Sequence, residues 1–166
     1  MDTVRTLSLI LATLTMGLIT GAFAVFWHAI MPGLATTDDR TFVSAFQSID
    51  KAIINPWFMI SGFAGALICT LAATFTQLGR PAFPWIALAL ALYLVAFVIT
   101  IAVNVPLNNA IKAAGLPERA TDLATIRAAF NEAGWRAWNL VRVLVSTAAF
   151  AGLTWALVVH GRTMAS

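Results

Sequence analysis

A cluster of aromatic and polar side chains near residue 140 has the spacing of one helix face. Four residues recur at positions i, i+3, i+4 and i+7: Trp135, Trp138, Asn139 and Arg142. Side chains at this spacing are neighbours on a helix. Arg142 lies nearly two turns inside an apolar stretch, so its guanidinium must either extend to water or point toward buried acceptors. No carboxylate occurs within the long apolar stretches, and an anionic ligand could therefore balance Arg142.

Further polar residues lie near the ends of the other apolar stretches. Asn104 and Asn108 are four positions apart on either side of a proline, and they share a face if the helix continues past it. His28 follows Trp27 near the end of the first apolar stretch, and Asn55 precedes the second. We expect the amide oxygens of Asn55, Asn104 and Asn108 to be acceptors for the guanidinium.

The composition of the 166-residue chain indicates an integral membrane protein. Apolar residues make up 60% and charged residues 10%, against about half and about a quarter in soluble domains. A soluble fold would expose too much apolar surface, and disordered chains are poor in apolar residues. One cysteine and two histidines exclude an internal disulfide framework and a multi-histidine metal site within one chain. The sequence has no Lys/Arg run, so we expect no nucleic-acid partner.

Four segments are long and apolar enough to cross the about 30 Å hydrocarbon core of a bilayer. They cover residues 7–30, 56–76, 83–105 and 137–159. We predict an all-α, four-helix membrane bundle that forms a single domain over residues 1–166, with the lipid bilayer as its partner. Because the spans alternate in direction, both termini and the short second connection lie on one side. The two long connections lie on the other side, where the polar residues would meet in one pocket.

The two long connections are expected to contain helices of their own. In the first, apolar residues recur at spacings of four, three and four: Phe42, Phe46, Ile49 and Ile53. This pattern predicts an amphipathic helix on the bundle or on the membrane surface. In the third connection we expect a helix from residues 117–118 to about Ala133, with Gly134 at its junction with the fourth span. The side of the termini carries almost only basic residues, which favours cytoplasmic termini.

The polar motifs resemble those of one family. An N-x-P-x-N segment ends the third span and a W-x-x-W-N-x-x-R segment begins the fourth. This order, with the pattern of long and short connections, resembles the anthrone-oxygenase-like proteins, small four-span membrane proteins that are largely of unknown function. The residues that match are Asn104, Pro106, Asn108, Trp135 or Trp138, Asn139 and Arg142. The resemblance extends over nearly the whole chain.

The resemblance implies an oxygenase-like activity on a lipophilic aromatic or polyketide-type substrate such as an anthrone, without an obvious bound cofactor. Removing the acidic C–H proton of an anthrone gives an enolate that reacts with dioxygen. Such a site needs a base, an oxyanion stabiliser and aromatic walls. His28 would be the base. Arg142 with Asn104, Asn108 or Asn139 would stabilise the enolate, and Asn55 would also line the pocket. Trp27, Trp135 and Trp138 would stack on the rings.

Other interpretations remain open. The tryptophans could form only an interfacial belt, the asparagines could repair the proline kink, and Arg142 could extend to water. The main alternative function is a non-enzymatic membrane protein that binds a quinone or haem, with His28 and Met31 as axial ligands, or that holds a single metal ion at His28. A scaffold subunit is a further alternative, in which Gly17 and Gly21 pack a homo-oligomer.

Overall fold

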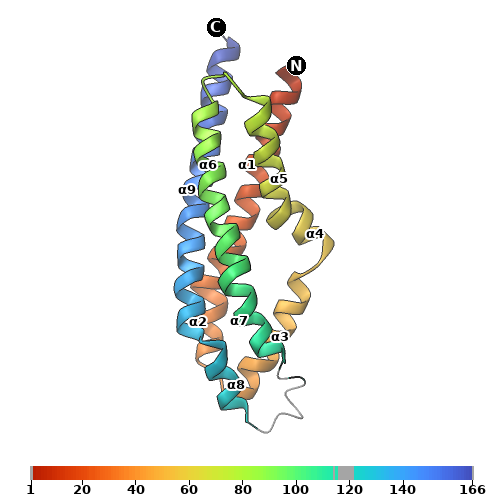
Figure 1. Cartoon of the computed structure of the whole chain (residues 1–166), viewed down its shortest axis with the longest axis vertical. Helices are drawn as coiled ribbons and strands as arrows, with labels where there is room; N and C mark the ends of the chain where they lie inside the picture. Colours follow the sequence, from red (N-terminus) through yellow and green to blue (C-terminus); the bar gives the residue numbers. More distant parts are fainter. Residues whose placement is uncertain (1, 114, 116–121, 166) are drawn as a thin grey trace.

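The computed structural model describes residues 2–113, 115 and 122–165, and the chain over these residues forms long helices without a strand (Figure 1). Four helical stretches are long and apolar enough to cross a membrane: Asp2–Ala35, Pro56–Thr76, Phe83–Ala113 and Leu123–Met164. The predicted all-α bundle with four spans is thereby confirmed, and the composition and span number are those of a multi-pass membrane protein. Both termini lie at the same end of the bundle as the short turn between the second and third stretches (Figure 1).

Three of the four stretches change from α-helix to π-helix and back along their length. The first consists of α1 (Asp2–Val25), η1 (Phe26–Ile30) and α2 (Met31–Ala35). The second consists of α4 (Pro56–Phe58), η2 (Met59–Phe63) and α5 (Ala64–Thr76). The third consists of α6 (Phe83–Ile99), η3 (Thr100–Asn104) and α7 (Val105–Ala113). A separate helix, α3 (Asp39–Ile53), connects the first stretch to the second, and α8 (Leu123–Phe130) precedes the long α9 (Glu132–Ala165).

The π-helical segments explain why two of these stretches continue past prolines that were expected to end them. The first and third spans were expected to end at Ile30 and Val105, but both helices continue past Pro32 and Pro106. A proline ring clashes with the carbonyl four residues earlier in an α-helix. Those carbonyls belong to residues in the middle of η1 and η3, where the wider π-helical turn leaves room for the ring. The prolines therefore widen these helices instead of ending them.

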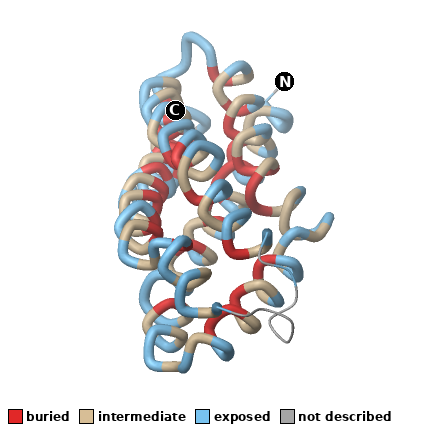
Figure 2. The backbone as a smooth tube through the Cα atoms, turned by 60° about the horizontal axis from the view of Figure 1, so that its bottom comes forward, coloured by how far each residue is buried: buried red, intermediate tan, exposed pale blue. Residues whose placement is uncertain are grey.

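The core near the termini is built from small residues and a few large ones. α9 packs against α1 and α6, and α1 packs against α5. Positions such as Ala12, Ala66, Ala89 and Ala149 are fully buried between these helices, because small side chains let membrane helices approach closely. Figure 2 shows that the buried positions follow the inward sides of the helices and that the exposed positions follow the outward sides. Gly17 lies against the ring of Phe150 within the chain.

The amphipathic helix predicted in the first long connection is present as α3, and it packs on the bundle. Its buried residues are Phe42, Val43, Phe46 and Asp50, whereas Ile49 of the predicted apolar face is only half-buried. Phe46 lies 4.5 Å from the ring centroid of Phe130 in α8. Asp38 caps the start of α3, and its carboxylate accepts a hydrogen bond from the amide of Thr41.

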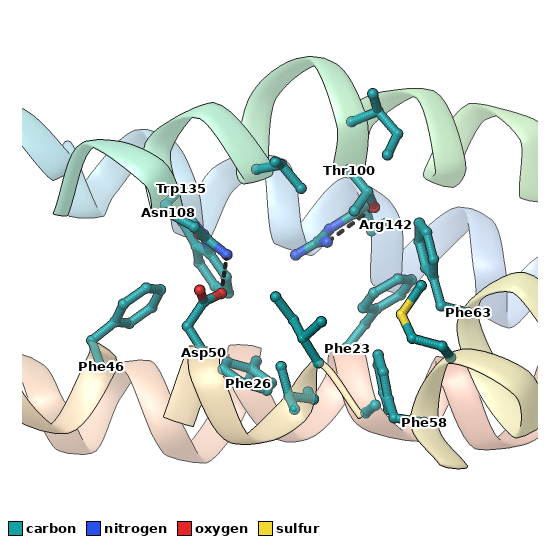
Figure 3. A pocket seen from close by; sticks show the side chains of 16 residues that line it. Phe23, Phe26, Phe46, Asp50, Phe58, Phe63, Thr100, Asn108, Trp135 and Arg142 are labelled. Carbon is teal, nitrogen blue, oxygen red and sulfur yellow. Dashed lines mark hydrogen bonds between the residues drawn. The ribbon is translucent and has the colours of Figure 1, made fainter. Parts of the chain in front are cut away.

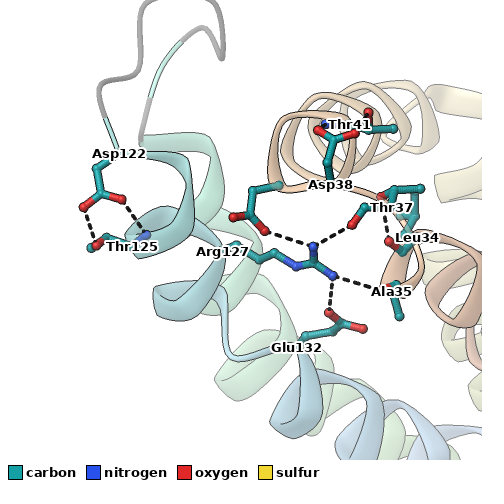
Figure 4. A network of polar contacts seen from close by, with 10 residues as sticks. Leu34, Ala35, Thr37, Asp38, Thr41, Asp122, Thr125, Arg127 and Glu132 are labelled. Atoms are coloured by element: carbon teal, nitrogen blue, oxygen red, sulfur yellow. Dashed lines mark hydrogen bonds and ion pairs between the residues drawn. The ribbon is translucent and has the colours of Figure 1, made fainter.

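Arg127 of α8 holds the connections together at the end of the bundle away from the termini (Figure 4). Its guanidinium donates to the carbonyl of Thr37 (2.9 Å) and pairs with Asp39 (3.0 Å) and Glu132 (3.2 Å). It also lies 4.2 Å from the ring centroid of Phe42. One side chain thus joins the start of α3, α8 and the start of α9.

The helix predicted in the third connection differs from the observed one. Its expected start at residues 117–118 lies outside the described residues. α8 begins at Leu123 and ends at Phe130 rather than near Ala133, because Asn131 adopts a left-handed conformation (φ 51°). The side-chain oxygen of Asn131 then accepts from the amide of Gly134 at the start of α9. Asn131, and not Gly134, therefore marks the junction with the fourth span.

Candidate functional site

A cavity of about 230 Å³ lies where α1, α3, α9 and the three π-helical segments meet (Figure 3). Its volume is somewhat smaller than the about 300–1,000 Å³ typical of drug-sized ligand sites, which suits a small ligand. Six of the sixteen residues that form the wall are aromatic: Phe23, Phe26, Phe46, Phe58, Phe63 and Trp135. Each π-helical segment contributes to the wall, in keeping with the frequent occurrence of π-bulges at functional sites.

Arg142 of α9 reaches this cavity as a buried cation. Its guanidinium donates to the hydroxyl of Thr100 in η3 (3.1 Å) and to the side-chain oxygen of Asn139 (2.8 Å). It also lies over the ring of Phe23, 4.4 Å from the centroid, where the negative face of the ring attracts it. Among the described residues no carboxylate pairs with Arg142. A buried charge without a counter-charge is unfavourable, so the cavity favours an anion beside it.

Asn139 and Asn104 support the wall and contribute no surface to it. Asn139 is fully buried and donates to the carbonyl of Phe23 (3.1 Å) while it accepts from Arg142. Asn104 donates to the carbonyl of Trp135 (3.4 Å) from the end of η3. These bonds attach α9 to α1 and to η3 at the level of the cavity. The two amides therefore position Arg142 and Trp135.

A carboxylate lies at the other end of the cavity. Asp50 of α3 is only 6% exposed. Its two oxygens accept from the amide of Asn108 (2.6 Å) and pair with the ammonium of Lys112 (2.8 Å), both on α7. The side-chain oxygen of Asn108 in turn accepts from the indole nitrogen of Trp135 (2.7 Å). Asp50 and Asn108 both line the cavity, and Figure 3 shows the Arg142 guanidinium directed toward their side of it.

Asp50 was not predicted from the sequence, because acids were considered only within the membrane spans. The signal was present in the amphipathic helix. Asp50 lies four residues after Phe46 and seven after Val43, so it belongs to the buried face of α3. An acid on the apolar face of a helix is unusual and indicates a buried partner.

His28 was expected to face the same pocket, and the structure places it elsewhere. The residue is exposed on η1 and is not part of the cavity wall. Phe26, two positions earlier, takes the wall position. Two residues are about half a helical turn, so the imidazole lies on the opposite side of the helix. Among the described residues no group of three His, Cys, Asp or Glu side chains is arranged to hold a metal ion.

Three other predicted site residues also lie away from the cavity. Trp27 and Trp138 are exposed on the outside of the bundle. Trp138 falls at the edge of the inward helix face that Trp135, Asn139 and Arg142 share. Asn55 caps α4: its oxygen accepts from the amide of Phe58 (2.9 Å) and its nitrogen donates to the carbonyl of Ala52 (2.9 Å). Of the nine predicted site residues, the wall contains three: Asn108, Trp135 and Arg142.

A family model described as anthrone oxygenase matches residues 42–152. The matched part runs from α3 to the middle of α9 and includes Asp50, Asn108 and Arg142. No curated protein and no solved structure matches the chain.

Proposed function

The chain belongs to the anthrone oxygenase family, and we propose that its cavity binds a flat aromatic ketone of the anthrone type and promotes oxidation of this ketone by dioxygen to a quinone. The observation that carries the proposal is the joint presence of the Asp50 carboxylate and the Arg142 guanidinium on one aromatic-walled cavity. Acid–base catalysis of enolate formation needs both a base and a cation near the developing oxyanion.

In the first step Asp50 acts as the base. It takes a proton from the methylene group of the ketone, and the electron pair of that C–H bond moves into the ring system to give an enolate. The negative charge resides mainly on the former carbonyl oxygen, where Arg142 stabilises it. Asn108 orients the Asp50 carboxylate through its 2.6 Å hydrogen bond.

In the second step dioxygen is the oxidant. The former methylene carbon of the enolate gives its electrons to dioxygen and forms a C–O bond, and a proton from Asp50 completes a hydroperoxide. Loss of the second hydrogen of that carbon as a proton then breaks the O–O bond, forms the new C=O bond and releases water. Anthrone and dioxygen thus become anthraquinone and water, and the protein ends in its starting protonation state.

The aromatic wall supplies the binding energy for the rings. Phe23 and Phe26 lie beside the space between the two charged groups, and Phe46 lies beyond Asp50 (Figure 3). All three line the cavity together with Trp135. Aromatic pairs contribute about 0.5–1.5 kcal/mol each beyond the burial of their area. In this proposal Asp50 takes the role of base that the resemblance assigned to His28, because Asp50 lies on the wall and His28 does not.

The test is the rate of anthraquinone formation from anthrone by the purified protein, followed by absorbance. We expect Asp50→Asn to lower kcat by about 10²–10⁴-fold and Arg142→Gln to lower it by about 10²–10³-fold. The control variant His28→Ala should retain the wild-type rate. Equal rates for Asp50→Asn and wild type would contradict the proposal. Binding of anthraquinone without any turnover of anthrone would instead support the quinone-binding alternative.

A further inference from the structure

The cavity has an opening on the side of the bundle. Three apolar residues belong to its wall and are at the same time exposed on the outside: Ile54 (62%), Ile101 (53%) and Val105 (37%). Ile54 lies in the corner between α3 and α4, Ile101 in η3 and Val105 at the start of α7. We call these three residues the mouth. Because α3 and α4 border it on one side and η3 and α7 on the other, the mouth opens laterally.

Exposed tryptophans mark two levels along the bundle. Trp85 and Trp155 lie near the termini and contact each other at 6.3 Å between ring centroids. Trp27 and Trp138 form the second group, and all four are exposed. Trp138 and Trp155 are 17 positions apart on α9 (155 − 138), which is about 26 Å at 1.5 Å per residue.

This separation is close to the about 30 Å thickness of the hydrocarbon core. Tryptophan prefers the boundary between hydrocarbon and headgroups, so the two groups mark the two surfaces of the membrane. Trp27 and Trp138 point outward because they lie at this boundary.

The mouth lies slightly closer to the middle of the membrane than the second group of tryptophans. Ile101 follows Trp85 by 16 positions along α6 and η3 (101 − 85), or about 24 Å, so its depth falls short of the membrane surface. On one side the exposed residues beside the mouth, such as Val98 and Ile60, are apolar. On the other side Ile54 also borders a polar hollow that is lined by Gln47, Lys51 and Lys112. The opening therefore faces acyl chains close to the headgroups.

We propose that the substrate enters the cavity and the product leaves it sideways through the mouth, directly from the membrane interface. The identity of the substrate rests on the proposed function, but the route rests only on the positions of the mouth and of the two tryptophan groups. The ligand is then an aromatic ketone dissolved in the bilayer. Flat aromatic molecules with one polar atom gather at this depth for the same reason that tryptophan does. The ring system passes from lipid to aromatic wall without crossing water.

Asn55 positions one edge of the mouth. Its hydrogen bonds to Ala52 and Phe58 join the end of α3 to the start of α4. They fix the corner that carries Ile54.

The experiment uses the full-length protein in phosphatidylcholine vesicles that contain a photoreactive lipid. The probe is a phosphatidylcholine with a benzophenone near the ester end of one acyl chain. Benzophenone is an aryl ketone, and on illumination it forms bonds with nearby C–H groups. A second lipid with benzophenone at the end of the chain tests depth. Labelled residues are identified by mass spectrometry after proteolysis.

We expect the first lipid to label residues of the cavity wall, such as Phe23 and Phe46, and the second lipid to label them several-fold less. Ile101→Trp, which fills the mouth, should abolish labelling of the wall. Val98→Trp adds the same side chain one turn away on the lipid-facing surface and should leave the labelling unchanged. Labelling confined to outward residues, or equal labelling of the wall in Ile101→Trp and wild type, would overturn the lateral route.

The outcome can be separated from that of the proposed function. Labelling of the wall without turnover of anthrone would keep the route and reject the oxygenase. Turnover without labelling of the wall would keep the oxygenase and reject the route. Thermal unfolding of both tryptophan variants in detergent shows that they remain folded.

Discussion

The side chain of Asn108 donates a 2.6 Å hydrogen bond to the carboxylate of Asp50, and this contact joins a helix outside the four membrane spans to the third span. α3 therefore does more than cover the bundle. It carries the acid of the cavity, whereas α9 carries the cation. The two charges reach one space from helices that are far apart in the sequence.

Asn108 is expected to be a strong determinant of stability. Asn108→Ala removes the bonds to both Asp50 and Trp135, and each buried group left unsatisfied costs about 1–3 kcal/mol. We expect the free energy of unfolding in detergent to fall by about 2–4 kcal/mol, since the two losses overlap. The control is Asn109→Ala, an exposed neighbour that should change it by less than about 0.5 kcal/mol. A loss in Asn108→Ala as small as that in Asn109→Ala would show that the Asn108 bonds contribute little.

Lys112 should be energetically coupled to Asp50. Lys112→Met leaves the buried carboxylate without its cation, which costs about 3–5 kcal/mol for a fully buried pair. Lys112 is 36% exposed, so water screens the pair and we expect a loss nearer about 1–2 kcal/mol. The double variant Asp50→Asn/Lys112→Met should recover part of this loss, as measured by a double-mutant cycle of unfolding. Lys51→Met is the matched control, and additive effects of Asp50 and Lys112 would contradict the coupling.

Gly65 should be required for the π-helical segment η2. A Cβ atom at this position would collide with the carbonyl oxygen of Ile60. We expect Gly65→Ala to lower the free energy of unfolding by about 1–3 kcal/mol and to reduce ligand binding, because η2 contributes Met59 and Phe63 to the wall. Gly21→Ala meets no atom within 4 Å and should raise stability by about 0.5–1 kcal/mol. Unfolding in detergent and binding of anthraquinone test both. A neutral Gly65→Ala would mean that the segment easily reverts to α-helix.

The start of α3 should loosen in acid. Hydrogen bonds from the hydroxyl and amide of Thr41 hold the pKa of Asp38 below its ordinary value. A lowered pKa means that the capping contribution is fully present above about pH 4 and is lost as the pH falls through the lower value of the folded state. Hydrogen exchange at the Thr41 amide should therefore accelerate in acid beyond its intrinsic pH dependence. Asp38→Asn should remove this extra acceleration, and an unchanged profile in that variant would contradict the assignment.

The fold follows from the sequence more readily than the site does. Length and hydropathy are sufficient for the four spans, and the spacing of Phe42 and Phe46 is sufficient for the amphipathic helix. The π-helical segments were not predictable in the same way. Pro32 and Pro106 normally indicate helix ends, and the pattern of single residues does not show that a wider turn precedes them.

The candidate site could be predicted only in part, for the same reason. Arg142, Asn108 and Trp135 could be placed together because their spacing defines faces of long helices. His28 could not be placed, because a small change in helical turn decides whether residue 26 or residue 28 faces inward. Asp50 required knowledge of how α3 docks, and its position on an apolar face was the only sign in the sequence.

Proton removal without dioxygen tests the central claim most directly. Anthrone is incubated with the protein anaerobically in D₂O, and loss of its methylene signal is followed by proton NMR. We expect wild type and His28→Ala to accelerate the exchange equally and Arg142→Gln to accelerate it weakly. In Asp50→Asn the exchange should stay at the rate of buffer alone. Exchange at the wild-type rate in Asp50→Asn, or its loss in His28→Ala, would contradict the account.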